Sequence, residues 1–509
     1  MFMIRYVRTR LERRRQQRYN EIWNPDGSIN PDKLLSLSKE YGNSVYKYMP
    51  LDQDSHWVPY NADLESILAC IKGDEAILRG RRLKHLHPNP NVDHTFHASI
   101  MVRGSIQFDL DHKEVTEGLY SGPTQEIKIF VKVSPMLYNQ IIRGNNFQIN
   151  KCYQTELRFH QLIVPILREY QKSVNQAYKS PIYHYLDIKE THPLCYGTRP
   201  EWPTLTTNSR MYLICMPDMT DDYFLFDPLV GCHAYDAFAA VDALARFHAV
   251  SLAYKINHSR AFQQTLKPAA KPYVSPADVY FRFSEMEKDL ADIKRIKKLK
   301  KHWGLIERVL RRSHTMLSKS PQDGPWTGLC HGRANAYNFL VQIHPSDIKL
   351  RARRCILTDM KHVEYNSVLS DVIFLLITSC RPDVFRKGDL DFVIKNYSLK
   401  LQCYLRNHLL SDSQMEPYSM ENCLAEAKRV FQDDILKGIQ HLKYLCVKQK
   451  YQQEYRAFSS FPTLTRYGMC KYVRVQKVTY NERLTVIFRK LIKHKFIVDV
   501  PDEAGPSHA

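Results

Sequence analysis

A segment in the second half of the chain carries the side chains best suited to chemistry. It reads GLCHGRANAYNFL over residues 328–340, and CILTDMKHVEYNSVLSDVIFLL follows over residues 355–376. A loop of the form H-x-D-x-x-x-x-N, followed by a strand that ends in Asp, is typical of phosphoryl transfer. In that arrangement the loop Asp orients the acceptor hydroxyl, and Asn and the second Asp hold Mg²⁺. His331, Asn338 and Asp359 keep this spacing, but Arg333 stands where the pattern has its Asp.

Two residues upstream match the other half of such a site. The segment Ile127 to Val133 (IKIFVKV) alternates as a strand does and turns Lys132 inward or into a cleft. The next helical stretch, Tyr153 to Tyr170, carries Glu156 in its first turns. Alone, Lys132 would be a surface lysine of an edge strand. In order with Glu156, Asn338 and Asp359, it is predicted to contact nucleotide phosphates while Glu156 holds it in place.

The surrounding pattern predicts the elements that position these residues. Met211 to Met216 reads as a short buried strand, and Tyr235 to Tyr254 as a helix with His248 on its apolar stripe, where a satisfied core histidine is expected. Pro165 is expected to kink or end the first part of its helix. Strands come mainly first and helices mainly later, which predicts an α+β protein with a small antiparallel-sheet N-lobe and a larger helical C-lobe.

Together these segments resemble the ecdysteroid-kinase-like (CHK kinase-like) branch of the aminoglycoside and choline kinase superfamily. HGRANAYNFL is similar to its HGDxWxNNxxF loop, and the resemblance runs from about residue 60 to 497. Four further segments agree with the family: IFVKVSP, YQTELRFH, HPLCYG and VDALARFHAVSLA. The resemblance implies a protein-kinase-like two-lobed fold. If the site is competent, it also implies ATP and Mg²⁺ as cofactors and a small-molecule alcohol, steroid-like or choline-like, as the acceptor.

Carried over residue by residue, the resemblance assigns Lys132 and Glu156 to nucleotide binding, Asn338 and Asp359 to the metal, and a loop-bracing role to His331. The chain also departs from the family at three places. Arg333 replaces the catalytic Asp, the segment 91–101 lacks the glycine of the phosphate-binding turn, and residues 359–361 read D-M-K where D-F-Q or D-F-E is usual. A positioned base contributes about 10²–10⁴-fold. The departures predict a weakly active enzyme or a pseudokinase.

Several alternatives stay open at this point. Arg333 could pair with Asp359 and so occupy the metal ligand, or it could bind phosphate directly. Asn338 and Asp359 could be a turn residue and a strand cap. The whole chain could also be a non-catalytic ligand-binding or scaffolding protein that uses the kinase-like cleft or its basic surface.

Charge and composition bear on the partners and the cellular compartment of the protein. The formal net charge of +20 is compatible with an acidic partner. No nucleic-acid motif accompanies basic runs such as residues 294–301, so a solvated helix face is the preferred interpretation of that run. Twelve scattered cysteines and the absence of a long apolar run predict reduced thiols, no transmembrane segment and a cytoplasmic protein. The Arg-rich start leaves mitochondrial targeting as a minor alternative.

The expected domain organisation has four parts. Residues 1–58 form a basic N-terminal extension, 59–216 the N-lobe, 217–497 the helical C-lobe, and 498–509 a disordered tail. The sequence leaves the acceptor substrate and the oligomeric state open.

Overall fold

The computed structural model describes part of the chain. The described residues are 83–89, 100–109, 124–133, 147–178, 187–193, 195–204, 207–219, 223–226, 231–270, 286–317, 319, 321–343, 352–387, 390–446 and 477–498. They form two compact units. Unit 1 takes in the described residues up to Tyr153 and those from 195 to 218, and unit 2 takes in the other described residues.

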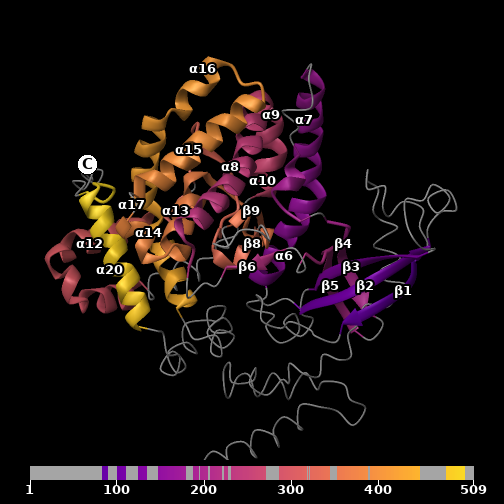
Figure 1. Ribbon diagram of the computed structural model, residues 1–509, viewed down its shortest axis with the longest axis horizontal. Coiled ribbons are helices and arrows are strands. Elements are labelled where there is room, and N and C mark those ends of the chain that lie inside the picture. Colours follow the sequence, from indigo (N-terminus) through magenta and orange to yellow (C-terminus); the bar gives the residue numbers. More distant parts are fainter. Residues whose placement is uncertain are drawn as a thin grey trace, which may run out of the picture. The chain divides into compact units, whose positions relative to one another are not determined.

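Unit 1 is built on one antiparallel sheet with the strand order β1-β2-β3-β5-β4, seen as arrows in Figure 1. Its strands are β1 (Leu83–Asn89), β2 (Ile100–Asp109), β3 (Thr124–Val133), β4 (Gly197–Thr204) and β5 (Thr207–Pro217). The alternating segment that carries Lys132 lies in the central strand β3, where Lys132 pairs with Met101 of β2 and Ile214 of β5. The lysine is therefore on a central strand, not on an edge.

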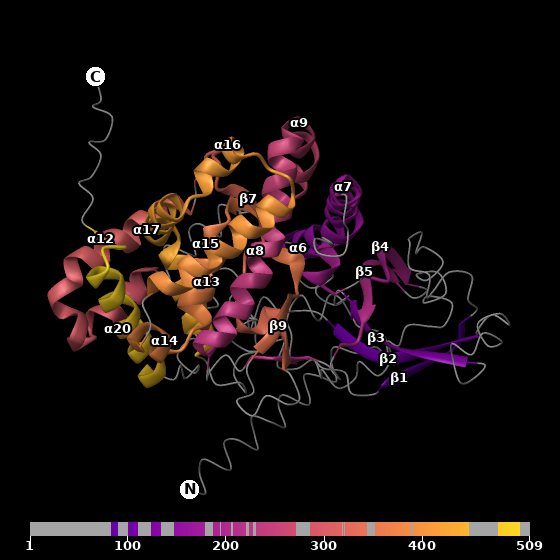
Figure 2. The ribbon, with the colours of Figure 1, turned by 45° about the horizontal axis from the view of Figure 1, so that its top comes forward.

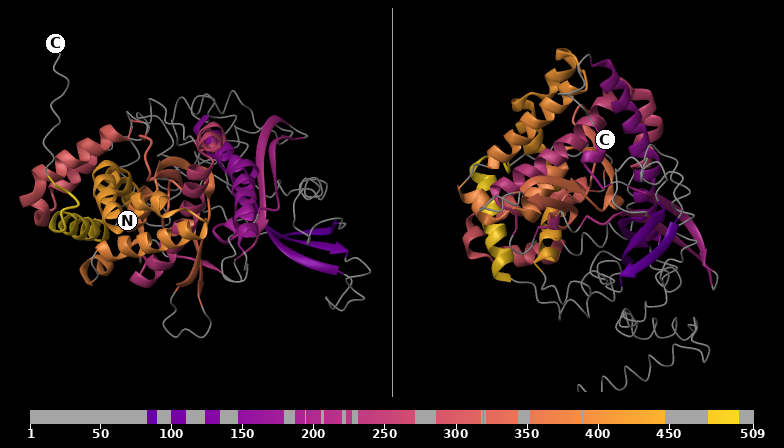
Figure 3. Two further views of the ribbon diagram at one scale, coloured as in Figure 1. Left: turned by 90° about the horizontal axis from the view of Figure 1, so that it is seen from above. Right: turned by 45° about the vertical axis from the view of Figure 1, so that its right-hand side comes forward.

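Unit 2 is mainly helical. Its longer helices are α7 (Val164–Ala177), α8 (Ala234–Asn257), α12 (Trp303–Met316), α13 (Leu369–Ser379), α15 (Leu390–Asn407), α17 (Met420–Leu445) and α20 (Lys477–Lys493). Helix α8 packs against α13 and α15, as Figure 2 shows. Helix α17 packs against α12, α13 and α20. Figure 3 shows the ribbon from two further directions. Shorter helical segments complete the unit: η3 (Phe159–Ile163), η4 (Ile188–Glu190), α9 (Ser259–Ala261), η5 (Phe262–Leu266), α10 (Lys267–Ala269), η6 (Lys297–His302), η7 (Ala336–Asn338), η8 (Met360–His362), α14 (Pro382–Lys387), α16 (Asp412–Met415) and η9 (Glu416–Tyr418).

Two small sheets lie among these helices. Strand β7 (Thr327–Cys330) pairs with β10 (Glu364–Ser367), and β8 (Phe339–Ile343) pairs with β6 (Phe224–Leu225) and β9 (Ala352–Leu357). Cys330 at the end of β7 is opposite Glu364 at the start of β10, and Phe339 at the start of β8 is opposite Leu357 at the end of β9. The two connecting segments, 331–338 and 358–363, must therefore run next to each other.

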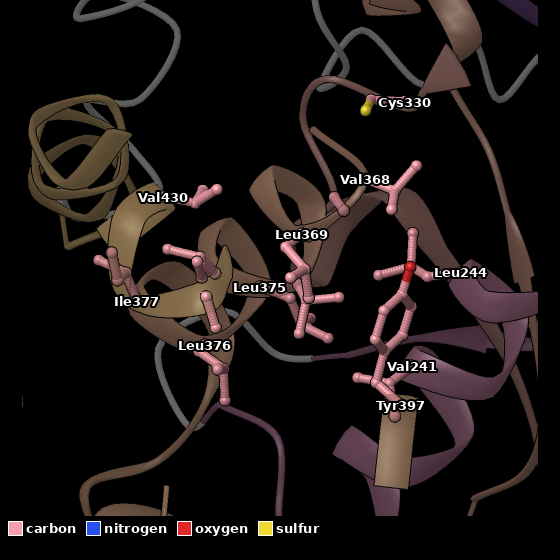
Figure 4. Close-up of a cluster of buried hydrophobic side chains, with 14 of the residues drawn as sticks. Val241, Leu244, Cys330, Val368, Leu369, Leu375, Leu376, Ile377, Tyr397 and Val430 are labelled. Carbon is pink, nitrogen blue, oxygen red and sulfur yellow. The ribbon is translucent and has the colours of Figure 1, made fainter. Parts of the chain in front are cut away.

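The core of unit 2 forms where α8, α13, α15 and α17 meet. Helix α13 is buried along its whole length, which explains why its sequence is apolar without a polar face. Figure 4 shows the Tyr397 ring of α15 beside Val241 and Leu244 of α8, with its hydroxyl turned toward the end of the cluster where Cys330 and Val368 lie. This core borders directly on the segment that follows β7.

Most of the predicted elements are confirmed. The α+β class, the strand with Lys132, the strand at 211–216 and the long helix with buried His248 are all present. Near Pro165 the chain stays helical. It passes from α6 (Phe147–Arg158) through a π-helical turn at 159–163, which accommodates the missing proline N–H, into α7. The predicted strand to Asp359 ends two residues early, at Leu357.

Some predictions cannot be compared with this structure. The N-terminal extension 1–58, the segment 91–99 and almost all of the tail 498–509 lie outside the described residues. The predicted lobe boundaries stay predictions. No helix in the described ranges combines the length and the apolar character needed to cross a membrane.

The central helix gives a first testable prediction. Leu375 of α13 is fully buried, so L375A should lower the free energy of unfolding by about 2–5 kcal/mol, because the cavity adds to the lost burial. Leu399 of α15 is 61% exposed and offers the same chemical change at the surface. L399A should change the unfolding free energy by less than about 1 kcal/mol in urea denaturation. Equal effects of the two variants would contradict the placement of α13 in the core.

Candidate functional site

The candidate site is the loop from His331 to Asn338, between β7 and β8, with the segment that faces it after β9. Backbone hydrogen bonds join the two segments. The Thr358 N–H donates to the Asn338 carbonyl at 2.9 Å, and the His331 Nε2 contacts the Thr358 carbonyl at 2.7 Å. These contacts bring Asn338 and Asp359 into one neighbourhood, 21 positions apart in the chain.

The Asp371 carboxylate holds the start of the loop. Its Oδ2 accepts the His331 N–H at 2.5 Å, and its Oδ1 accepts the Gly332 N–H at 2.9 Å. Asp371 lies in the first turn of α13 and is 1% exposed. Two successive backbone donors on one buried carboxylate fix both the position and the direction of the chain as it leaves β7.

His248 contacts Asp371 from a second helix, and Tyr397 contacts His248 from a third. His248 of α8 contacts Asp371 Oδ2 through Nε2 at 3.1 Å, and its Nδ1 contacts the Tyr397 hydroxyl of α15 at 2.8 Å. Nε2–H can donate to the carboxylate while Nδ1 accepts from tyrosine, so a neutral imidazole satisfies both contacts. His248 is thus the satisfied core histidine that the sequence predicted, and it links α8, α13 and α15 to the loop.

Electrostatics keep this carboxylate charged. Burial alone would raise the pKa of Asp371, but the hydrogen bond from His248 and nearby positive charge, including that of Lys437, outweigh it and lower the pKa. The stabilisation from Asp371 is therefore present at neutral pH. It is lost only as the pH falls below the ordinary value of 3.8.

The loop glycine is required by geometry. Gly332 has φ +80°, and a Cβ placed there would lie 2.0 Å from the His362 carbonyl oxygen. Only glycine combines this backbone conformation with so close an approach. The contact sets the spacing between the loop and the segment that contains Asp359.

Arg333 is the exposed residue of this otherwise buried loop start. Its N–H donates to His331 Nδ1 at 3.3 Å, and its carbonyl accepts from the side-chain amides of Asn335 and Asn338, at 3.0 and 2.8 Å. Within the described part of the chain, the guanidinium makes no ion pair. The backbone at position 333 is therefore fixed while its charged group reaches solvent.

Asn338 and Asp359 have different surroundings. Asn338 is 2% exposed, and its amide orientation is set by the hydrogen bond to the Arg333 carbonyl. Asp359 has left-handed backbone angles, φ 62° and ψ 55°, which aspartate and asparagine adopt more readily than most residues. Its side chain is 11% exposed. Both residues lie at the junction of the two segments.

Lys361 contacts the carboxylate that the sequence assigned to a metal. Its Nζ lies 3.0 Å from Asp359 Oδ1, and the two side chains are 6% and 11% exposed. An ion pair this sheltered from water is screened less than a surface pair. Asp359 therefore has a lysine of the following helical turn, η8 (Met360–His362), as its partner, and the alternative of an Arg333–Asp359 ion pair is not formed.

These contacts decide whether a resident Mg²⁺ fits. The Asn338 amide oxygen is a suitable ligand, but Mg²⁺ on Asp359 would have to lie against the Lys361 ammonium. Positions 333, 359 and 361 carry a formal charge of +1 in this chain, whereas Asp, Asp and Gln would carry −2. The residues present do not fit a resident divalent cation.

A second group of possible metal ligands is excluded by its own bonding. His248, Cys330 and Asp371 lie close enough together to share an ion. Burial raises the pKa of the Cys330 thiol well above 9.0, and the thiol sulfur lies 3.3 Å from the Ser367 carbonyl and 3.4 Å from that of Asn366. A protonated thiol is a poor ligand, and Asp371 already binds the loop. These three residues are therefore assigned to holding the loop in place and not to binding a metal.

The predicted nucleotide residues lie in different units. Lys132, in β3 of unit 1, is 2% exposed, and Glu156, in the last turn of α6, is 1% exposed and belongs to unit 2. Burial of a lysine and a glutamate is unusual unless each has a partner. The assignment of both to nucleotide binding stays a prediction.

Sequence reasoning missed two residues that shape the site. Asp371 was visible as the one acidic residue inside the apolar run of 368–377, and a charge there needs a buried partner. Lys361 was noted as a departure from D-F-Q, but the pairing with Asp359 depends on the left-handed turn. No local pattern gives that turn.

A model of the ecdysteroid kinase-like family matches residues 95–409. No curated protein matches the chain.

Solved structures give more distant similarities. An ethanolamine kinase of Plasmodium vivax has 9% identity and a TM-score of 0.33, covering 94% of this chain and 100% of its own. A choline kinase of Cryptosporidium parvum Iowa II has 11% identity and a TM-score of 0.35, covering 82% and 91%. An amicoumacin kinase in complex with AMP-PNP and Ca²⁺ has 12% identity and a TM-score of 0.34, covering 80% and 90%.

The bonding of Asp371 gives a second prediction. D371N should lower the free energy of unfolding at pH 7 by about 2–4 kcal/mol, because an amide cannot accept both loop N–H groups and the His248 N–H. The difference from wild type should shrink as the pH falls below 3.8, because the unfolded wild-type chain then takes up a proton at Asp371, and the folded carboxyl, whose pKa is lowered, does so at a lower pH.

The matched control is D412N, at an exposed aspartate of α16. Urea unfolding at pH 7 and pH 3 measures both variants. If D371N were as stable as D412N at pH 7, Asp371 would not hold the loop.

Proposed function

We propose that this chain, which belongs to the ecdysteroid kinase-like family, binds a nucleotide but transfers its phosphoryl group slowly or not at all. The preferred nucleotide is ATP, which the family resemblance implies. The chain is then a pseudokinase, or a weak phosphotransferase whose acceptor is a hydroxyl of a steroid-like or choline-like compound.

The observation that carries this proposal is the side chain at position 333. The loop around it is intact: Asp371 accepts the two N–H groups, Gly332 keeps its positive φ, and Asn338 contacts the Arg333 carbonyl. The base that this loop presents in the family is replaced by an exposed guanidinium. A guanidinium cannot accept the proton of an acceptor hydroxyl at neutral pH, because it is already fully protonated and has no acceptor atom.

A second obstacle is the Asp359–Lys361 ion pair. Phosphoryl transfer depends on positioning and on neutralising the charge of the transferred group, and metal ions supply much of that neutralisation. The 3.0 Å contact of Lys361 with Asp359 opposes a metal there. Loss of the base and opposition to the metal are independent reasons for a slow reaction.

The rival function is non-catalytic binding of another ligand, or scaffolding through the cleft or the basic surface. A thermal-shift measurement separates the two. If the chain binds ATP, its stability rises by RT ln(1 + [L]/Kd), about 2.7 kcal/mol at a ligand concentration of 100 Kd. No shift with millimolar ATP, with or without Mg²⁺, would favour the rival.

Restoring both residues tests the proposal directly and gives the third prediction. Arg333→Asp alone should raise the rate of ADP formation from ATP by less than about tenfold, because Lys361 still opposes the metal. Arg333→Asp combined with Lys361→Gln should raise it by about 100-fold or more, since a positioned base contributes ~10²–10⁴-fold.

The control is R333A combined with K361Q, which removes the same positive charges without adding a carboxylate. It should stay near the wild-type rate. Wild-type turnover at the ~1–100 s⁻¹ of ordinary kinases would contradict the proposal.

A further inference from the structure

Lys361 and Asp359 point to a consequence that goes beyond slow catalysis. We infer that the Lys361 ammonium takes the place of the divalent cation, so that the phosphates of a nucleotide bind at this site without any metal. The inference rests on the proposed nucleotide binding. It adds how the phosphates are held and which ionic form of the nucleotide is preferred.

The first support is the position of the ammonium. Lys361 Nζ lies 3.0 Å from Asp359 Oδ1, at the carboxylate that the family pattern assigns to a metal. An ammonium has three N–H donors and a compact positive charge, so it can contact a carboxylate and a phosphate oxygen together. It resembles a metal ion in bridging two anionic groups.

The second support is the cost of moving Lys361 aside. The two side chains are 6% and 11% exposed, so separating them would break a contact between charges that are largely sheltered from water. A cation arriving from solvent competes with a group that is covalently attached two residues away. Tethering keeps the effective concentration of the ammonium high at any Mg²⁺ concentration.

The third support is the charge that a ligand would meet. Arg333 exposes a guanidinium on the facing loop, in the same unit as Asp359 and Lys361. Guanidinium binds phosphate oxygens in a bidentate manner, and it has no ion pair within the described residues. With a formal charge of +1 over positions 333, 359 and 361, the site attracts free ATP more strongly than the less negative magnesium complex.

The expected preference for free ATP over the magnesium complex is the reverse of the preference of a metal-dependent site. There, two carboxylates repel free ATP, and Mg²⁺ between protein and phosphates is needed for binding. The sign of the magnesium effect on ATP affinity therefore distinguishes the two cases, whatever the absolute affinity is.

The experiment is calorimetric titration of the whole chain with ATP, once in EDTA and once in excess Mg²⁺, and it gives the fourth prediction. Wild type should bind ATP in EDTA at least as tightly as in Mg²⁺. K361Q should bind about tenfold or more weakly in EDTA, because the positive charge beside Asp359 is then removed, and Mg²⁺ should now tighten its binding. The change of sign between the two proteins is the expected result.

Two further variants make the result specific. D359N removes the carboxylate, and asparagine tolerates the same left-handed backbone, so the turn is kept. D359N should bind ATP in EDTA as tightly as wild type or more tightly, and in Mg²⁺ it should bind no more weakly than wild type does. A metal-bridged site would instead lose binding in Mg²⁺, because a ligand of the metal is removed. K267Q removes a lysine that pairs with Asp323 elsewhere in unit 2 at 2.8 Å, and it should leave the magnesium effect of wild type unchanged.

The possible failures are distinct. Wild-type binding that Mg²⁺ tightens tenfold or more would overturn the metal-free site and leave slow catalysis standing. So would a K361Q protein that behaves like wild type. Absence of ATP binding in both conditions would instead overturn the proposed function and the inference with it.

Discussion

The site depends on one buried carboxylate that accepts two successive backbone N–H groups. Asp371 ties His331 and Gly332 to helix α13, and His248 ties Asp371 to α8 and, through Tyr397, to α15. None of these contacts involves the side chain of residue 333. The loop can therefore keep its shape with either aspartate or arginine at that position.

The parts of the structure that follow from local patterns were predictable. The alternation of apolar and polar residues predicted the strand with Lys132, and an apolar stripe predicted helix α8. The spacing of His331, Asn338 and Asp359 predicted the loop and the segment that faces it. The bonding of Asp371 was not predictable in this way, because its loop partners lie about 40 residues away in the sequence. A buried charge indicates that a partner exists, but the sequence does not identify which residue it is.

The pairing of Lys361 shows the same limit at short range. In an extended strand, residues two apart point the same way, and in a helix they diverge, so neither pattern predicts a 3.0 Å contact in a turn. The left-handed conformation at Asp359 makes the contact possible. Sequence could identify residues 359–361 as a departure from the family, while the physical meaning of that departure needed the backbone.

The two changes of charge, at Arg333 and Lys361, affect binding and chemistry differently. Both add positive charge where a polyphosphate would lie, which favours binding. Neither replaces what transfer needs: arginine accepts no proton, and an ammonium carries half the charge of Mg²⁺ and does not coordinate the transferred oxygens. A tethered cation also cannot leave with the product or respond to metal concentration. Under the proposed function, the same two residues that oppose turnover favour phosphate binding, which separates two properties that an active kinase combines.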